Sequence, residues 1–346
     1  MNSWDVIIAG AGIIGVSLAL ELRERGHTVL VLDRAEPGGE ASSAAAGMLA
    51  ATDPETPPAL RPVAFESARM FPEFVLKLET AGKMLVDFRR VGTIALLPDA
   101  TAPAEYRSLS ADELQRLEPS LKNPGQHAFF VQEDSVDPFL LVQATLAAAR
   151  NLGVEVRGHA AVKDIRPRGN VVEVVTESYT FASRCAVDCR GAWSGAPVRP
   201  RKGQMLYVQP RAGVLQHVLR APDVYLVPRS SGKILVGATV EDVGFDKSVD
   251  PATIHSLLNA ATKYLPELAS APITQSWAGL RPGTPDDLPI IGPTETPGVF
   301  VASGHFRNGI LLAPITAKIM AHLVEGRPSP LDIHAFAPSR FRSALK

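Results

Sequence analysis

The fold is decided by the stretch Val6-Ile7-Ile8-Ala9-Gly10-Ala11-Gly12-Ile13-Ile14-Gly15. Its first part, Val6–Ala9, is a short apolar run that predicts a buried parallel strand. A glycine turn follows, and then the pattern predicts a helix from about Ile13 to Arg25. Thr28–Leu32 predicts a second buried strand, which is closed by Asp33. Together these segments predict a βαβ unit.

The glycines of this stretch match the pattern G-x-G-x-x-G between a predicted strand and a predicted helix. Gly10 permits a tight turn, Gly12 lets a pyrophosphate approach the backbone, and Gly15 lets helix and strand pack closely. The helix N-terminus offers donors and partial positive charge to phosphate. Asp33 is placed to accept hydrogen bonds from ribose hydroxyls. We therefore predict a dinucleotide site; the alternative is a glycine-rich turn in an ordinary α/β protein.

Length and composition narrow the class of protein. The chain has 346 residues, which suits two domains, and it is 46% hydrophobic and 21% charged, as soluble globular proteins are. A net charge of −1 argues against a nucleic-acid partner or an anionic membrane. The uncharged run Val6–Leu20 resembles a signal-peptide core, but Asp5 precedes it and it is too short to span a bilayer. We expect no targeting or transmembrane segment.

The two cysteines, Cys185 and Cys189, lie on or beside a predicted strand. Residues four apart on a strand are separated by about 13 Å, which is too far for a disulfide. No second Cys/His cluster accompanies them, so no metal site is expected. Reduced cysteines favour a reducing, cytoplasmic compartment.

Five further helices and eleven further strands are predicted from periodicity and from turn residues. The helices are Ala41–Ala51, Val63–Ala81, Pro138–Asn151, Pro251–Leu265 and Gly309–Val324. The strands are Val91–Leu97, Ala128–Gln132, Val154–Val156, Val162–Ile165, Val171–Thr176, Cys185–Cys189, Met205–Gln209, Tyr225–Pro228, Lys233–Ala238, Ile273–Trp277 and Val299–Ala302. Parallel-type units at both ends and antiparallel runs between them predict a discontinuous α/β architecture.

Several blocks resemble one family and come in that family's order over nearly the whole chain. The G-x-G-x-x-G stretch, taken together with Ser42-Ser43-Ala44-Ala45-Ala46-Gly47-Met48, is similar to the flavin-binding N-terminus of the D-amino-acid oxidase and glycine oxidase family. From spacing alone, this block fits a cofactor contact and an alanine-rich core helix equally well. Residues 224–229 with 235–239 resemble the family's substrate-domain hairpin, and 277–284 with 288–292 its substrate-arginine segment. Residues 304–314 are similar to the C-terminal signature of glycine oxidases.

The resemblance implies a Rossmann-type FAD-binding domain of residues 1–85, 138–200 and 275–346. It also implies an α+β substrate domain of residues 86–137 and 201–274, built on an antiparallel sheet. FAD is expected to be noncovalent, because no cysteine lies between residues 277 and 292. The cofactor-binding residues expected are Gly10, Gly12, Ile13, Ile14, Gly15, Asp33, Arg34, Ser42, Ser43, Ala46, Gly47, Met48, Val162, Gly191, Trp193, Gly304, His305, Arg307, Asn308, Gly309, Ile310 and Leu311.

Three residues are expected to be catalytic. Arg281 would pair with the substrate carboxylate, because a planar guanidinium binds a carboxylate through two hydrogen bonds. Tyr225 would add a hydroxyl hydrogen bond to the same carboxylate, and Arg307 would lie at the flavin. The alternatives are a surface arginine and a core tyrosine. Gly304 to Gly309 would cross the flavin ring, with a helix N-terminus near Ile310 stabilising negative charge on reduced flavin.

The resemblance implies oxidative deamination of glycine, sarcosine or small D-amino acids. Hydride would pass from the substrate Cα to flavin N5, oxygen would give hydrogen peroxide, and the imine would hydrolyse to a 2-oxo acid, which is glyoxylate from glycine. A role in thiazole biosynthesis follows by analogy. The alternatives are a D-amino-acid oxidase of broader specificity, a dehydrogenase that passes electrons to a quinone or carrier, and a flavin-binding sensor without turnover.

Three departures from the family pattern stand out. The chain is several residues shorter than expected between Gly195 and Lys202. Homo-oligomers are common in the family, but this shortening leaves the oligomeric state of this chain open. Arg190 stands where relatives usually carry a small residue. Val240 stands where close relatives carry methionine, and its smaller side chain would enlarge the pocket.

Overall fold

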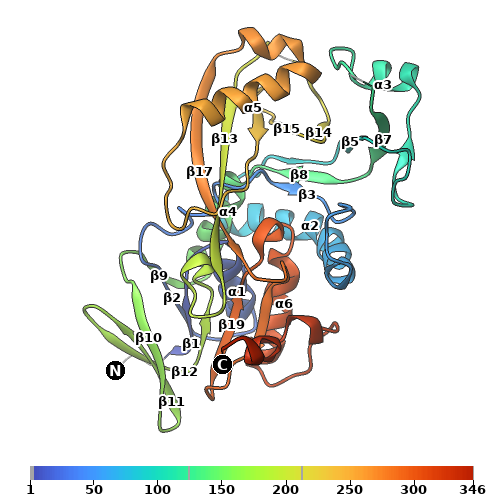
Figure 1. The fold of residues 1–346 in the computed structure, drawn as a ribbon. Helices are drawn as coiled ribbons and strands as arrows, with labels where there is room; N and C mark the ends of the chain where they lie inside the picture. The colour runs from blue at the N-terminus through green and yellow to red at the C-terminus, as the bar shows by residue number, and fades with distance from the viewer. Residues whose placement is uncertain (1–3, 124, 212, 346) are drawn as a thin grey trace.

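The computed structural model describes residues 4–123, 125–211 and 213–345, and it consists of two halves that meet in the middle of the molecule (Figure 1). One half holds a largely parallel sheet with helices, and the other a largely antiparallel sheet. A small three-stranded sheet forms from segments that connect them. This arrangement confirms the predicted α/β class with a second, sheet-based half.

The first sheet is built around parallel strands in the order β9-β2-β1-β12. The hairpin β10–β11 continues from the first part of β12, while β19 lies parallel to its last residues and pairs with β18. β1 and β2 are buried almost throughout, as expected for parallel strands covered on both faces. The strands are β1 (Trp4–Ala9), β2 (Val29–Leu32), β9 (Glu155–Arg157), β10 (Val162–Arg168), β11 (Val171–Thr176), β12 (Thr180–Asp188), β18 (Ile290–Pro293) and β19 (Val299–Ser303).

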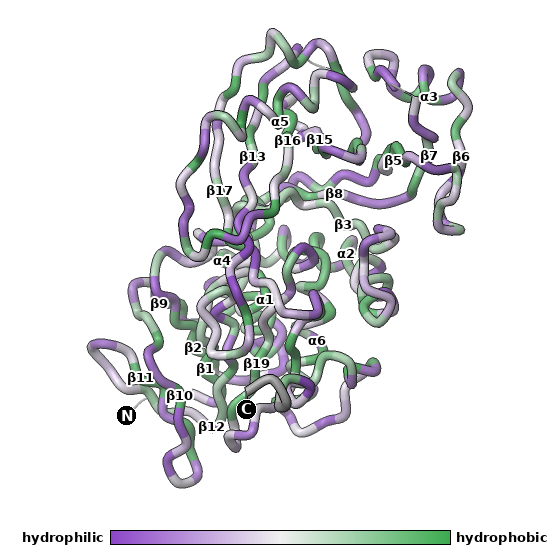
Figure 2. The backbone as a smooth tube through the Cα atoms, viewed as in Figure 1, coloured by the Kyte–Doolittle hydropathy of each residue, from purple (hydrophilic) through white to green (hydrophobic). Residues whose placement is uncertain are grey.

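Four helices cover one face of this sheet and enclose the largest hydrophobic core of the described residues (Figures 1 and 2). They are α1 (Ile13–Glu24), α2 (Arg61–Gly82), α4 (Pro138–Asn151) and α6 (Ala313–Val324). α1 packs against α4 and α6, and α2 packs against the same two helices. On the opposite face, Ile7 and Leu30 pack against Val174 and Phe181 of the strands beside them. Each fully buried Leu or Ile contributes about 1.5–3 kcal/mol.

The second sheet has the strand order β17-β13-β16-β15-β14-β5-β7-β6, and α5 (Pro251–Tyr264) packs on one of its faces. Its pairs are antiparallel except for β14 with β5, which is parallel and was not predicted. The hairpin expected from residues 224–229 and 235–239 is confirmed as β15 and β16. The strands are β5 (Thr93–Leu97), β6 (Arg107–Ser108), β7 (His127–Val131), β13 (Arg199–Val208), β14 (Val218–Arg220), β15 (Tyr225–Pro228), β16 (Ile234–Gly237) and β17 (Ile273–Gly283).

The remaining elements are short. β3 (Met48–Leu49), β8 (Asp134–Val136) and β4 (Phe88–Arg89) form the third sheet. α3 (Ala111–Leu117) was not predicted. The 3-10 turns are η1 (Pro58–Leu60), η2 (Gly191–Trp193), η3 (Pro266–Ser270), η4 (Phe306–Asn308), η5 (His334–Phe336) and η6 (Pro338–Leu345). Cys185 and Cys189 are free and buried. In the part of the chain that the structure describes, we find no helix that could cross a membrane.

The helix predicted over Ala41–Ala51 is wrong. Residues 41–44 form turns, a bend and two residues without regular structure follow, and then β3 begins at Met48. Gly47 has φ of 80°, and a Cβ there would lie 1.9 Å from the carbonyl oxygen of Val136. Met48 pairs with Ser135 in the third sheet. Tertiary contacts of this segment therefore override the helix propensity of its alanines.

Two predicted boundaries also differ from the structure. α6 begins at Ala313 rather than at Gly309, because Pro314 lacks the N–H that would bond to the Ile310 carbonyl in an earlier helix. The predicted domain boundary at residue 275 falls inside β17, which pairs with β13 over its whole length. These two strands run from the second sheet into the region where the halves meet (Figure 1).

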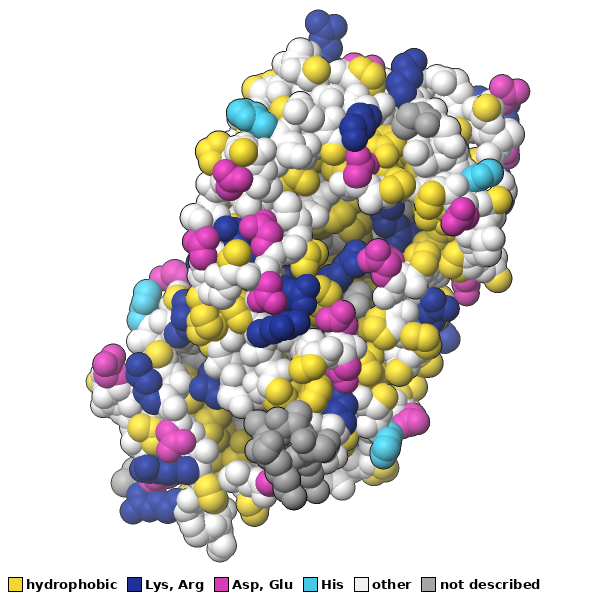
Figure 3. Space-filling model, in the orientation of Figure 1, with side chains coloured by type: hydrophobic (Ala, Val, Ile, Leu, Met, Phe, Trp, Pro, Cys, Tyr) yellow, Lys and Arg dark blue, Asp and Glu magenta, His cyan; other side chains and the backbone are white. Residues whose placement is uncertain are grey.

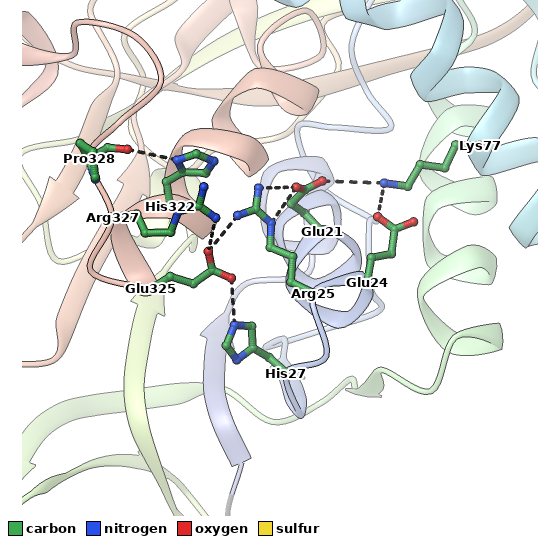
Figure 4. A network of polar contacts seen from close by, with 9 residues as sticks. All are labelled: Glu21, Glu24, Arg25, His27, Lys77, His322, Glu325, Arg327 and Pro328. Carbon is green, nitrogen blue, oxygen red and sulfur yellow. Dashed lines mark hydrogen bonds and ion pairs between the residues drawn. The ribbon is translucent and has the colours of Figure 1, made fainter.

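A polar network ties together the ends of three helices in the first half (Figure 4). Glu325, just after α6, accepts a 2.9 Å hydrogen bond from Arg25 and lies 3.2 Å from Nε2 of His27. Arg25 also pairs with Glu21, and Lys77 of α2 pairs with Glu24 of α1. Burial opposes the charge of Glu325, but the bonds from His27 and Arg25 lower the pKa of its carboxyl.

The lowered pKa of Glu325 predicts a loss of stability in acid. A depressed folded-state pKa stabilises the protein above the ordinary glutamate value of 4.5, and this contribution vanishes as pH falls through the folded-state value. Glu325→Gln should therefore cost about 1 kcal/mol at neutral pH and clearly less in acid. Urea unfolding at both pH values measures the difference. An equal loss at both would contradict the role of the carboxylate.

Candidate active site

A cavity of about 510 Å³ lies between the two sheets, within the range of small-molecule and cofactor sites. Basic and acidic side chains gather across the middle of the face drawn in Figure 3, where the two halves meet. Most of the predicted site residues line the cavity. They are Gly10, Gly12, Ile13, Ile14, Asp33, Arg34, Ser42, Ala46, Gly47, Met48, Val162, Gly191, Trp193, Tyr225, Arg281, Gly304, His305, Arg307, Gly309 and Ile310.

Four predicted residues do not line the cavity. A Cβ on Gly15 would lie 2.0 Å from the Gly10 carbonyl oxygen, so this glycine lets α1 pack against the turn. The Ser43 hydroxyl donates to the Gly38 carbonyl at 2.6 Å. The carbonyl groups of Asn308 and Leu311 accept hydrogen bonds at 2.8 and 2.5 Å, respectively. These residues support the shape of the wall behind the cavity.

The glycine turn after β1 packs closely against neighbouring backbone and side-chain atoms. Gly10 has φ of 107°, and a Cβ there would meet the Cys189 carbonyl oxygen at 2.3 Å. A Cβ on Gly12 would stand 3.2 Å from the Ser42 hydroxyl, which accepts a 2.9 Å hydrogen bond from the amide of Ile13. The N-terminus of α1 and a serine hydroxyl thus face the same space, as a pyrophosphate site requires.

Asp33 is fixed behind this turn. Its carboxylate accepts hydrogen bonds from the amides of Ala11 at 2.7 Å and Ala35 at 3.0 Å. Burial raises the pKa of Asp33 above its ordinary value, and the two amides oppose the rise. Because a carboxylate has about four lone-pair sites, two remain for ribose hydroxyls.

Arg190, which is expected to depart from the family pattern, pairs with a neighbouring acid. Its guanidinium donates to both oxygens of Asp188, at 3.0 and 2.8 Å, and to the carbonyl of Val162 at 3.1 Å. Burial alone would raise the pKa of Asp188, but these bonds lower it. Because Arg190 is neutralised by this pair, it lines the cavity without adding a net charge.

Residues 239–250, here named the strap, cover one side of the cavity. Val240 lines the cavity although 49% of its surface is exposed. Phe245 packs on Trp193, with 5.4 Å between ring centroids. Lys247 binds Glu40, at 3.1 Å. The strap therefore reaches from the second sheet to the first half.

The predicted carboxylate-binding arginine lies on β17. Arg281 donates to the Thr239 carbonyl at 3.0 Å, and a Cβ on Gly203 would lie 2.1 Å from its guanidinium. Gly203 and Arg281 belong to paired strands, so β13 presents a bare backbone at the point where the guanidinium crosses it. Among the described residues, Arg281 makes no ion pair with a carboxylate side chain.

Tyr225 and Arg307 lie in the same cavity wall as Arg281. The Tyr225 hydroxyl lies 3.6 Å from the sulfur of Met205, and its ring crosses Gly237. Burial raises the pKa of Tyr225, while the nearby charges of Arg281 and Arg307 oppose the rise. The structure therefore brings together the three residues predicted to be catalytic.

His305 cannot supply a charge at neutral pH. It is buried, and its Nε2 lies 3.2 Å from the Thr316 hydroxyl. Burial lowers the pKa of His305 to about 3, so the imidazole is neutral in ordinary buffers. Gly304 next to it has φ of 74°, and a Cβ there would collide with Thr284. This turn is fixed by packing rather than by charge.

The 41–48 segment is held by side chains of the second sheet. Trp277 Nε1 donates to the Ala44 carbonyl at 3.1 Å. Arg229 donates to the carbonyls of Ala46 at 2.7 Å and Val136 at 2.9 Å. The second sheet thus shapes a wall that the sequence pattern assigned to the first half.

Several lining residues were not among the expected site residues. They are Met205, Ala238, Lys163 and Glu40, of which Ala238 lies in the hairpin segment 235–239 that resembles the family. The alternation in Met205–Gln209 was noted and predicts which side chains share a face. It does not predict which face meets the cavity.

The sequence matches the DAO family, FAD dependent oxidoreductase, over residues 5–323. The chain belongs to this family. The predicted resemblance is thereby confirmed, and FAD is the cofactor. The glycine turn, the N-terminus of α1 and Asp33 fit the pyrophosphate and ribose of FAD.

Individual family members show how far the similarity extends. A bifunctional protein ThiO/ThiG of Trichormus variabilis is 37% identical over 98% of this chain but only 55% of its own length, so the chain spans about half of that relative. A glycine oxidase of Bacillus licheniformis is 35% identical over 97% of both chains. The crystal structure of glycine oxidase from Geobacillus kaustophilus has a TM-score of 0.94 and 31% identity, covering 98% of this chain and 99% of that one.

The bonds of Arg229 predict that FAD retention depends on the second sheet. Arg229→Met leaves two buried carbonyl groups without donors, which costs about 2–4 kcal/mol and loosens the 41–48 segment. We expect a lower Tm and at least about tenfold weaker FAD binding, measured as flavin retained per protein after gel filtration. Arg107→Met, at an exposed pair with Glu113, is the control. Full retention of FAD in Arg229→Met would refute this dependence.

Proposed function

We propose that this chain is an FAD-dependent amino-acid oxidase that acts on glycine, sarcosine or another small amino acid. The observation that carries the proposal is the pair Arg281 and Tyr225 in one wall of the cofactor cavity. Arg281 has no carboxylate partner among the described side chains, and Gly203 leaves room for its guanidinium. The similarity to glycine oxidases supports the same substrate class.

The chain's own residues would bind and orient the substrate. Arg281 would hold the carboxylate through two hydrogen bonds, and Tyr225 would donate a third. Because the pKa of Tyr225 is raised by burial, its hydroxyl keeps its proton at neutral pH. His305 is held at Thr316 and offers no base. The amine would therefore react in its neutral form, having lost a proton to solvent.

Bound FAD supplies the hydride acceptor for the substrate Cα–H bond and passes the electron pair to oxygen. Glycine, water and oxygen then yield glyoxylate, ammonia and hydrogen peroxide, which balances the reaction. The catalytic contribution of the protein is orientation, because a held carboxylate and amine convert an encounter into an intramolecular step. Similarity to the ThiO/ThiG relative supports a role in thiazole formation, where the imine would be used before it hydrolyses.

Substrate identity is tested by anaerobic mixing. The FAD-loaded protein would be mixed in turn with glycine, sarcosine, D-alanine and D-proline, and the loss of flavin colour followed. Fast bleaching by glycine or sarcosine, with peroxide formed on admission of air, supports the proposal. Preference for D-alanine or D-proline would favour a broader D-amino-acid oxidase. Reoxidation by a dye but not by oxygen would indicate a dehydrogenase, and no bleaching at all would reject turnover of these amines.

The carboxylate contact predicts a separate mutational result. Arg281→Ala should raise KM by about 100-fold, because two charge-assisted hydrogen bonds are lost. Gly203→Ala should raise KM as well, since its Cβ would displace the guanidinium, while Tm changes little. Gly195→Ala is the control, because a Cβ there meets its nearest neighbour at 3.6 Å. An unchanged KM in both Arg281→Ala and Gly203→Ala would remove Arg281 from the carboxylate site.

A further inference from the structure

Among the described residues that line the cavity, Arg34, Arg190 and Arg307 pair with acidic side chains, whereas Arg281 does not. Arg281 makes no ion pair with a described carboxylate. Arg307 pairs with Glu55, and both residues lie close to the solvent, with 43% and 70% of their side-chain surfaces exposed. Burial opposes the charge of Arg307, but the pair with Glu55 raises the pKa of the guanidinium. Arg281 and Arg307 thus bring two positive charges to the cavity, and Glu55, which does not itself line the cavity, lies against Arg307.

Glu55 is held in place by a fixed loop. Its amide donates to Asp53 at 2.9 Å, and Asp53 accepts from Arg220 at 3.2 Å. The amide of the neighbouring Thr52 donates to Glu133 at 3.0 Å, and Glu133 also pairs with Arg220 at 2.9 Å. Arg220 and Glu133 have little exposed side-chain surface. The loop that carries Glu55 is thus anchored to the second sheet beside the cavity.

The position of Glu55 has a consequence for substrate charge. Exposed ion pairs contribute little to stability, so fold stability alone does not account for this one. A substrate with one carboxylate needs only Arg281. A substrate with a second carboxylate would find Arg307 already paired and would also meet the negative charge of Glu55. Two like charges at short range repel one another even near the solvent, although less strongly than in a buried site.

We propose that Glu55 is a specificity-determining residue that cancels the charge of Arg307 and restricts the site to amino acids with a single carboxylate. The proposal rests on the proposed function, because it takes the cavity to be an amino-acid site. Removing the charge of Glu55 converts Arg307 into a second anion-binding group. Dicarboxylic amines then become substrates of the same cavity.

The experiment compares the holoenzyme with three variants. Glu55→Gln removes the charge at nearly constant size, and Glu55→Asp keeps it. Glu66→Gln is the matched control, because Glu66 pairs with Arg69 on α2, and Arg69, unlike Arg307, does not line the cavity. The measured quantity is the ratio of kcat/KM for iminodiacetate, which is glycine with a second carboxymethyl group, to kcat/KM for glycine.

Glu55→Gln should raise this ratio at least about tenfold, whereas Glu55→Asp and Glu66→Gln should leave it within about twofold. The increase should shrink at high salt, because screening weakens the attraction between Arg307 and the second carboxylate. An unchanged ratio in Glu55→Gln would overturn the proposal. An equal rise for both substrates would also overturn it, since that result indicates a wider opening and not a change in charge selection.

A binding measurement separates this inference from the proposed function. Acetate and malonate are unreactive, and their Kd values follow from the change in the flavin absorbance spectrum. Glu55→Gln should strengthen malonate binding at least about tenfold relative to acetate. If no amine is oxidised, the proposed function fails, yet these Kd values still decide the role of Glu55. Equal changes for the two anions would reject it.

Discussion

Much of the site depends on one buried guanidinium. Arg229 projects from the second sheet and donates to the carbonyls of Ala46 and Val136, while its Nε lies 3.2 Å from the Tyr207 hydroxyl. A buried charge is tolerated only when its hydrogen bonds are satisfied, so these backbone groups must stay where they are. The wall of the FAD cavity therefore has its shape only when the two halves are docked.

The parts of the fold that the sequence predicts well are those fixed by local signals. The bounds of α4 were predicted correctly, because Pro138 suits a first helical turn and Asp137 caps it. The helix predicted over Ala41–Ala51 failed, because long-range contacts at Gly47 decide that segment. α3 was missed even though Ser110 and Glu113 form a capping box, a signal that was present in the sequence.

The site was predictable to a different degree. Sequence motifs identified the glycine turn, Arg281 and Tyr225 as parts of the site, and residues of all three line the same cavity. Glu55 was hidden, because it lies in a proline-rich loop and reaches Arg307 across 252 positions of sequence. Contacts between residues so far apart in the sequence form only when the chain folds, and no periodicity in the sequence marks them. Residues that act through a distant partner therefore lie beyond what pattern and spacing can reveal.

The antiparallel ribbon of β13 and β17 constrains how this chain could change length. The ribbon runs in register from Arg199 opposite Gly283 to Tyr207 opposite Gln275. An insertion or deletion of one residue in β17 before Arg281 would turn Arg281 to the opposite face of the sheet. We expect length variation to be tolerated instead in the connection before Arg199, outside the two paired strands. Insertions and deletions among proteins of this fold should therefore lie outside the ribbon of β13 and β17.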